Sequence, residues 1–138
     1  MNSKNRLLSE KNLANIEYDL ANERHLRTTI DEWDNIGKLR CLYHNDEIVI
    51  GYLNWIIKED TLEIADLFIH NPKHRQLGIG SILIKAVLKV AKEKKVNEVW
   101  GITQWDDYRV HDFYKKHGFA FADEVIDGSL RFSQNVNF

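Results

Sequence analysis

The segment from Thr61 to Ala91 constrains the fold most, because an apolar strand, a glycine turn and an amphipathic helix follow one another in it. Residues 61–70 predict the strand, and apolar residues at helical spacing predict a helix that begins at Gly78 or Gly80. Glycine lets backbone N–H groups approach a ligand without a Cβ in the way, and a helix N-terminus adds unpaired donors. The segment therefore predicts a backbone cradle for a phosphate or pyrophosphate.

Three other interpretations of the glycine turn compete with this prediction. A Walker-type loop needs a lysine after its last glycine, and Ser81 follows Gly80 instead. A dinucleotide fingerprint needs a third glycine where Leu83 stands, and it belongs after a first strand, whereas this turn follows a hairpin. A helix start whose glycines serve only the turn is the alternative without a ligand. The basic residues at 73–75 lie beside the turn and are placed to meet further phosphate charge.

The remaining pattern predicts a mixed α/β sheet with helices on its faces. A helix follows Ser9, and a second short helix spans Thr29–Ile36, with no strand evident before Ser9. The last helix begins at Asp106 or Asp107 and ends at Gly118. The expected strands cover Leu39–Tyr43, Ile48–Ile57, Thr61–His70, Val96–Thr103, Phe119–Ile126 and Ser129–Val136, with a hairpin turn at Asp127-Gly128.

The last helix carries a second motif, Phe113-Tyr114-Lys115-Lys116-His117-Gly118-Phe119. Together with Arg75-x-x-Gly78-x-Gly80, this motif resembles the signature of the GNAT superfamily of acetyl-CoA-dependent N-acetyltransferases, over residues 37–138. The resemblance implies an α/β (α+β) fold, with a mixed, mostly antiparallel, twisted sheet flanked by helices on both faces. It implies one N-acetyltransferase domain over residues 1–138, which transfers an acetyl group from acetyl-CoA directly to an amine without a metal.

The same resemblance implies which residues hold acetyl-CoA. The pantetheine arm pairs with the edge of the strand like an added strand, and a backbone N–H of Ile69 or its neighbours polarises the thioester carbonyl. Backbone N–H groups of the glycine turn hold the pyrophosphate. The expected cofactor-binding residues are Phe68, Ile69, His70, Arg75, Gln76, Leu77, Gly78, Ile79, Gly80, Ser81 and Asp107.

Tyr114 is the candidate general acid that the resemblance implies. A phenol with a pKa of about 10 can protonate a departing thiolate with little mismatch in pKa. The alternative is that Tyr114 is only a core aromatic beside Phe113. The candidate bases are Asp66 and Glu63, which are expected to point to opposite faces of their strand because side chains alternate. The alternative for Asp66 is a solvated or capping carboxylate. A third option is that no side chain acts as base and the free amine is drawn from solution.

The sequence departs from the family pattern at three positions. Asp107 stands where the family usually has an asparagine that touches the pantetheine arm, Val110 replaces a small residue, and Asn71 is an extra residue before Pro72. Asp107, Asn71 and the small size of the chain favour a second hypothesis, a catalytically inactive GNAT-fold module that binds an acyl-CoA or a protein partner.

Composition excludes several other classes of function. The 138 residues carry 19 basic and 21 acidic side chains, a net charge of −2 that argues against a general binder of nucleic acid or anionic membranes. Neither a signal peptide nor a membrane span is evident. The single Cys41 cannot form an internal disulfide, so the reducing cytoplasm is the expected compartment.

Histidines and partners complete the expectations. Pro72 between His70 and His74 argues against a helical metal-ligand pair, and His111 and His117 are expected at the surface. The expected acceptor is a small-molecule or peptide amine, and the final hairpin is available for pairing in a homodimer.

Overall fold

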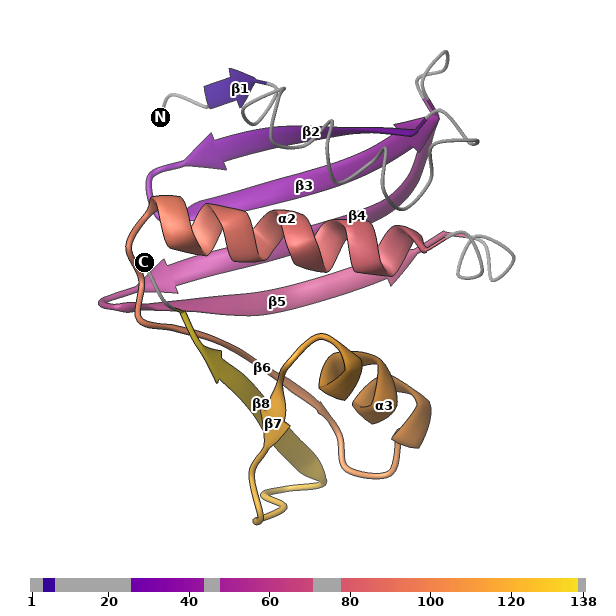
Figure 1. The fold of residues 1–138 in the computed structure, drawn as a ribbon, viewed down its shortest axis with the longest axis vertical. Helices are drawn as coiled ribbons and strands as arrows, with labels where there is room; N and C mark the ends of the chain where they lie inside the picture. Colours follow the sequence, from indigo (N-terminus) through magenta and orange to yellow (C-terminus); the bar gives the residue numbers. More distant parts are fainter. Residues whose placement is uncertain (1–3, 7–25, 44–47, 71–77, 137–138) are drawn as a thin grey trace.

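Within the residues that the structure describes, the fold is an eight-stranded sheet with two helices (Figure 1). It is taken from a computed structural model that describes residues 4–6, 26–43, 48–70 and 78–136. The strands lie in the order β1-β2-β3-β4-β5-β6-β8-β7. The bounds are β1 Lys4–Arg6, β2 Leu26–Trp33, β3 Ile36–Tyr43, β4 Val49–Lys58, β5 Thr61–Ile69, α2 Ile79–Glu93, β6 Glu98–Gln104, α3 Tyr108–Lys116, β7 Ala120–Phe121 and β8 Ser129–Asn135.

Strands β2 to β5 form an antiparallel meander, and one face of it holds the core. Leu39, Leu53 and Leu67 lie directly opposite one another on β3, β4 and β5, so their side chains share a face. Helix α2 covers this face, because a Cβ built at Gly51 on β4 would touch the side chains of Ile79 and Ile69. Burying these apolar side chains against α2 fixes the register of the meander, since a slip by one residue would turn them to solvent.

The two helices of the described chain are neighbours. Phe113 of α3 lies against Gly80 of α2, where a Cβ would approach its ring to 3.1 Å. Farther along α3, the ring of Tyr114 stacks on Phe132 of β8 with centroids 3.8 Å apart, and Phe119 packs edge-on against both. These aromatic contacts dock α3 onto the β6–β8 half of the sheet.

The structure corrects three sequence-based expectations. Thr29–Ile36 is not a helix: it belongs to β2, the following turn and the start of β3, and Leu26, Thr28 and Ile30 are buried at alternate positions on β2. A short strand, β1, does precede Ser9 and pairs with β2. The strand expected over Phe119–Ile126 shortens to the two residues of β7. The helix expected after Ser9 falls on residues outside the described ranges.

The other elements are confirmed. The hairpin turn has positive φ at both Asp127 (50°) and Gly128 (73°), the geometry that a two-residue turn between strands requires. Helix α3 begins after Asp107 and is followed by Gly118 at φ 89°. Within the described ranges, neither helix has the length and apolar character that crossing a bilayer requires.

Candidate active site

The sheet opens between β5 and β6, and this opening organises the site. The two strands pair in parallel only from Thr61–Glu98 to Glu63–Trp100, and beyond Glu63 they separate (Figure 1). Ala65 causes a bulge at the same place, because Asn54 pairs with Asp66 and Trp55 with Ile64, which leaves Ala65 without an opposite residue. Bulges bend a strand and increase its twist, so Ala65 turns β5 away from β6.

The bulge corrects one prediction about the candidate bases. Glu63 lies opposite Ile56 and Asp66 opposite Asn54, and Ile56 and Asn54 are two residues apart on β4. Glu63 and Asp66 therefore point to the same face of the sheet, the one away from α2, and not to opposite faces. Glu63 stays within the paired section of β5, whereas Asp66 stands where the opening begins, so the structure separates the two candidates by position.

The open edge of β5 presents backbone donors to the opening. The N–H of His70 donates to the carbonyl of Ile50 on β4 at 3.0 Å. Since successive N–H groups of a strand point to opposite edges, the N–H of Ile69 points into the opening, and so does that of Leu67. The side chains of Phe68 and His70 are exposed on the face away from α2. Their rings pack edge-on, with centroids 5.1 Å apart.

The N-terminus of α2 lies beside the opening. Gly78 has φ 76° and caps the helix without a side-chain hydrogen bond, and space is open around the Cβ it lacks. The first intrahelical bond runs from the N–H of Ile82 to the carbonyl of Gly78, so the N–H groups of Ile79, Gly80 and Ser81 have no acceptor within the helix. Gly78, Ile79, Gly80 and Ser81 therefore form the turn and the helix start that the sequence analysis expects to bind the pyrophosphate. Three further expected residues, Arg75, Gln76 and Leu77, lie outside the described residues.

Tyr114 is the buried polar group of the opening. Its side chain is 5% exposed and lies in the aromatic cluster with Phe132 and Phe119. Burial, and after it the negative charge of Asp66, raises the pKa of Tyr114 above its ordinary value. Tyr114 lies on α3, which docks against β8, and Asp66 lies on β5, so the expected acid and one expected base come from the two sides of the opening.

A tyrosine that the sequence analysis missed contacts Asp66. The hydroxyl of Tyr52 on β4 donates a hydrogen bond to Oδ2 of Asp66 at 3.1 Å. Partial burial, this hydrogen bond and the charge of Asp66 raise the pKa of Tyr52. The ring of Tyr52 also lies near Phe68 and His70, with centroids 5.7 Å away in both cases. No sequence signal identified Tyr52, because its role depends on the pairing of β4 with β5.

Two histidines differ from the expectation of surface positions. His111 is buried, and its Nε2 lies 2.9 Å from the carbonyl of Gln104. Half-buried His117 joins α3 to the cradle, because its Nε2 is 2.8 Å from the hydroxyl of Ser81. Burial, followed by the charges of Lys116 and Lys85, lowers the pKa of His117. The side chain of Ser81 is thus engaged by His117, which leaves its backbone N–H for the cradle.

Asp107 has a structural partner of its own. Its carboxylate accepts a hydrogen bond from the N–H of Val110 at 3.4 Å and so caps α3. This cap accounts for an aspartate at the position where the resemblance implied a contact with the cofactor. Among the described residues, no group of three or more histidine, cysteine, aspartate or glutamate side chains could hold a metal ion.

The fold places the chain in a class of α+β proteins whose sheet opens beside a helix N-terminus. Comparison with known proteins then identifies the family. The chain belongs to the Acetyltransferase (GNAT) family, whose model matches residues 9–119. In the solved structure of the PaiA N-acetyltransferase from Thermoplasma acidophilum in complex with coenzyme A, the same fold recurs with a TM-score of 0.67 and 17% identity, over 98% of this chain and 99% of that one.

Two curated relatives also match. The uncharacterized protein YxbD of Bacillus subtilis is 30% identical over 89 residues, which cover 64% of this chain and 52% of YxbD. The uncharacterized N-acetyltransferase MJ1207 of Methanocaldococcus jannaschii is 33% identical over 89 residues, which cover 60% of this chain and 37% of MJ1207. The chain therefore spans about half or less of the length of these relatives.

Proposed function

We propose that the protein is an N-acetyltransferase that transfers the acetyl group of acetyl-CoA directly to an amine, with Asp66 as base and Tyr114 as acid. The observation that supports this proposal is that Asp66 stands on β5 where β5 separates from β6, while Tyr114 is buried against Phe132 of β8 on the other side of the opening. Membership of the GNAT family and the coenzyme A complex of the PaiA enzyme support it.

The residues at the opening fit acetyl-CoA. The N–H groups of Ile79, Gly80 and Ser81 and the positive end of the α2 dipole suit a pyrophosphate. The edge of β5 from Leu67 to Ile69 offers backbone donors to an extended amide-bearing arm. When bound, acetyl-CoA supplies a thioester carbonyl and a thiolate leaving group.

Each proton then has a named residue in the proposed reaction. The amine nitrogen forms a bond with the thioester carbon, the C–S bond breaks, and Asp66 accepts the proton that the nitrogen releases. The Tyr114 hydroxyl donates its proton to the departing sulfur and recovers one from solvent. Tyr114 is protonated at neutral pH, the form that an acid needs, while burial and the charge of Asp66 raise its pKa and so lower the driving force for donating that proton. The N–H of Ile69 donates to the carbonyl oxygen.

The test is release of the CoA thiol in a panel of amines, with Tyr114→Phe and Asp66→Asn as variants. Phenylalanine keeps the stacking on Phe132, so we expect unchanged CoA affinity and a kcat lower by about 10²–10⁴, as for removal of a general acid. Tyr108→Phe is the matched control, because Tyr108 lies on the same helix and is 65% exposed. Asp112→Asn, at an exposed position of α3, is the control for Asp66→Asn.

Two outcomes would contradict the proposal. If the variants keep full activity, Tyr114 and Asp66 are not the acid and base. If the protein binds CoA but no amine releases the thiol, the inactive acyl-CoA-binding module becomes the better hypothesis. We propose the cytoplasm as the compartment, because the single cysteine, Cys41, cannot form an internal disulfide.

A further inference from the structure

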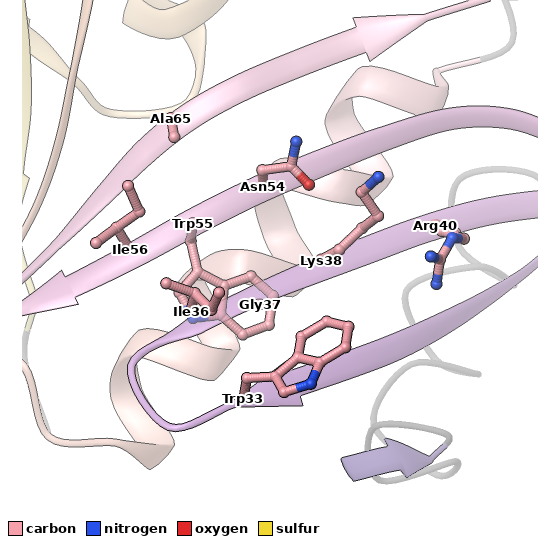
Figure 2. Close-up of a pocket in the computed structure, with 9 residues that line it drawn as sticks. All are labelled: Trp33, Ile36, Gly37, Lys38, Arg40, Asn54, Trp55, Ile56 and Ala65. Atoms are coloured by element: carbon pink, nitrogen blue, oxygen red, sulfur yellow. The ribbon is translucent and has the colours of Figure 1, made fainter. Parts of the chain in front are cut away.

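A pocket lies on the face of the sheet away from α2, next to the candidate active site (Figure 2). Its volume is about 330 Å³, at the small end of the range for ligand pockets. Trp33, Ile36 and Ile56 provide apolar walls, and Lys38, Asn54 and Ala65 complete the side toward β5. Figure 2 shows these side chains arrayed across β2 to β5. The pocket was not foreseen from the sequence, because its residues come from four separate strands.

The pocket is continuous with the proposed reaction centre. Asn54 lines the pocket and lies directly opposite Asp66, and Ala65 is the bulged residue that precedes Asp66. Asn54 and Asp66 share the face on which the pocket opens. A molecule whose amine reaches Asp66 therefore extends over Asn54 into the apolar walls.

The two cationic side chains that line the pocket, Arg40 and Lys38, differ in their partners. Arg40 forms an ion pair with Asp31, so its charge is matched locally. Lys38 makes no ion pair within the described part of the chain, and its Nζ lies 4.6 Å above the ring of Tyr52. The hydroxyl of the same Tyr52 donates to Asp66. One aromatic ring thus carries an ammonium group over its face and a carboxylate at its hydroxyl.

We propose that the acceptor is an amine with a bulky apolar body and an adjacent carboxylate, for which an apolar α-amino acid is the simplest example. Its amine lies at Asp66, its carboxylate at Lys38, and its side chain among Trp33, Ile36 and Ile56. A polyamine fits poorly, because its further cations would meet apolar walls and Lys38. This inference rests on the proposed function and deepens it by naming the substrate class.

The first test compares kcat/KM for four amines at saturating acetyl-CoA: L-phenylalanine, phenethylamine, L-alanine and spermidine. Phenethylamine lacks only the carboxylate of phenylalanine, and L-alanine lacks only the ring. We expect L-phenylalanine to be the best acceptor, the two truncated amines to be about 10-fold or more weaker, and spermidine to be weakest. Preference for spermidine, or equal use of all four amines, would overturn the inference.

The second test uses variants on the two sides of the pocket. Lys38→Gln should reduce the preference for L-phenylalanine over phenethylamine by about 10-fold, mainly through KM, because only the former has a carboxylate. Ile36→Ser should reduce the preference for L-phenylalanine over L-alanine, and at 46% exposure the change leaves the core intact. Ile126→Ser is the matched control, since Ile126 is 62% exposed on the β7–β8 turn, outside the pocket lining.

Binding separates a failure of this inference from a failure of the proposed function. Titration of L-phenylalanine into the CoA-loaded protein measures the pocket without turnover. Binding that Lys38→Gln weakens supports the acceptor class even if no amine is acetylated, in which case only the proposed function fails. Turnover of other amines with no binding of L-phenylalanine contradicts the acceptor class and leaves the proposed function intact.

Discussion

His117 illustrates how one side chain can connect two parts of a site that lie far apart in the sequence. Its imidazole contacts the Ser81 hydroxyl at the start of α2, and its carbonyl accepts a hydrogen bond from the Gln134 side chain at 2.9 Å. Phe113 packs edge-on against it with centroids 5.0 Å apart. These contacts hold α3, and with it Tyr114, against the cradle.

The lowered pKa of His117 gives a prediction for stability. In the unfolded chain this histidine titrates near 6.5, and in the folded protein it takes up its proton only at lower pH. The unfolded state therefore binds more protons below pH 6.5, so the free energy of unfolding falls as pH drops from that value through the folded pKa. Above pH 6.5 the effect is absent. We expect His117→Gln to lose less stability than the wild type between pH 7.5 and 5, as measured by urea unfolding.

The comparison with wild type isolates His117 from the other five histidines, which are present in both proteins. Ser81→Ala serves as a second variant that keeps the imidazole and removes its hydroxyl partner. Equal pH dependence in the wild type and His117→Gln would contradict the assignment of this titration to His117.

At the scale of elements, the β6–β8 pair shows how closely the sheet is fitted to α3. Gly101 of β6 lies opposite Phe132 of β8, and a Cβ at Gly101 would overlap the Phe132 ring. That ring is 1% exposed and stacks on Tyr114. A glycine at this position therefore makes room for the aromatic cluster that supports the proposed acid.

We expect Gly101→Ala to lower the free energy of unfolding by about 1–3 kcal/mol, because the added methyl group overpacks a buried site. It should also reduce kcat by displacing Tyr114. The double variant with Phe132→Leu should recover part of the stability, since leucine lacks the ring atoms that the methyl group meets. A double-mutant cycle by urea unfolding measures this coupling, and strictly additive costs would show that the contact is absent.

Most elements could be predicted from the sequence because local patterns specify them. The apolar stripe of α2, the Asp127-Gly128 turn and the glycine after α3 each have a short-range physical cause. Strand β2 was missed because the apolar residues Ile30, Trp33 and Ile36 are three apart, a spacing near the helical period, and the pairing of β2 with β3 overrides it.

The candidate site was predictable only in part. The glycine turn and Tyr114 stand in recognisable motifs, whereas the position of Tyr114 relative to the opening depends on how α3 docks on Phe132. The bulge did leave a signal that was overlooked. The leucines and isoleucines of β5 occur at 62, 64, 67 and 69, so their two-residue period breaks between Ile64 and Leu67. That break predicts one extra residue and places Glu63 and Asp66 on one face.

For the whole molecule, the opening divides the sheet into two parts joined by a short ladder. The β1–β5 part and the β6–β8–β7 part pair directly only through three residue pairs, from Thr61–Glu98 to Glu63–Trp100. The indole of Trp100 adds a hydrogen bond to the Thr61 hydroxyl at 3.2 Å. A ligand in the opening would contact both parts, so binding and stability should be coupled more strongly than at a surface site.

We expect CoA at 100 times its Kd to raise the free energy of unfolding by about 2.7 kcal/mol, and the Tm by roughly 5–10 °C. A sharper test is to measure which backbone amides CoA protects from exchange. In hydrogen exchange, the amides of Leu67 and Ile69 should slow on CoA addition, because they point into the opening, whereas that of Ile30 in the β2–β3 ladder should change least. Slowing confined to α2, with no change at Leu67 and Ile69, would place CoA at the helix N-terminus alone and contradict an arm paired along β5.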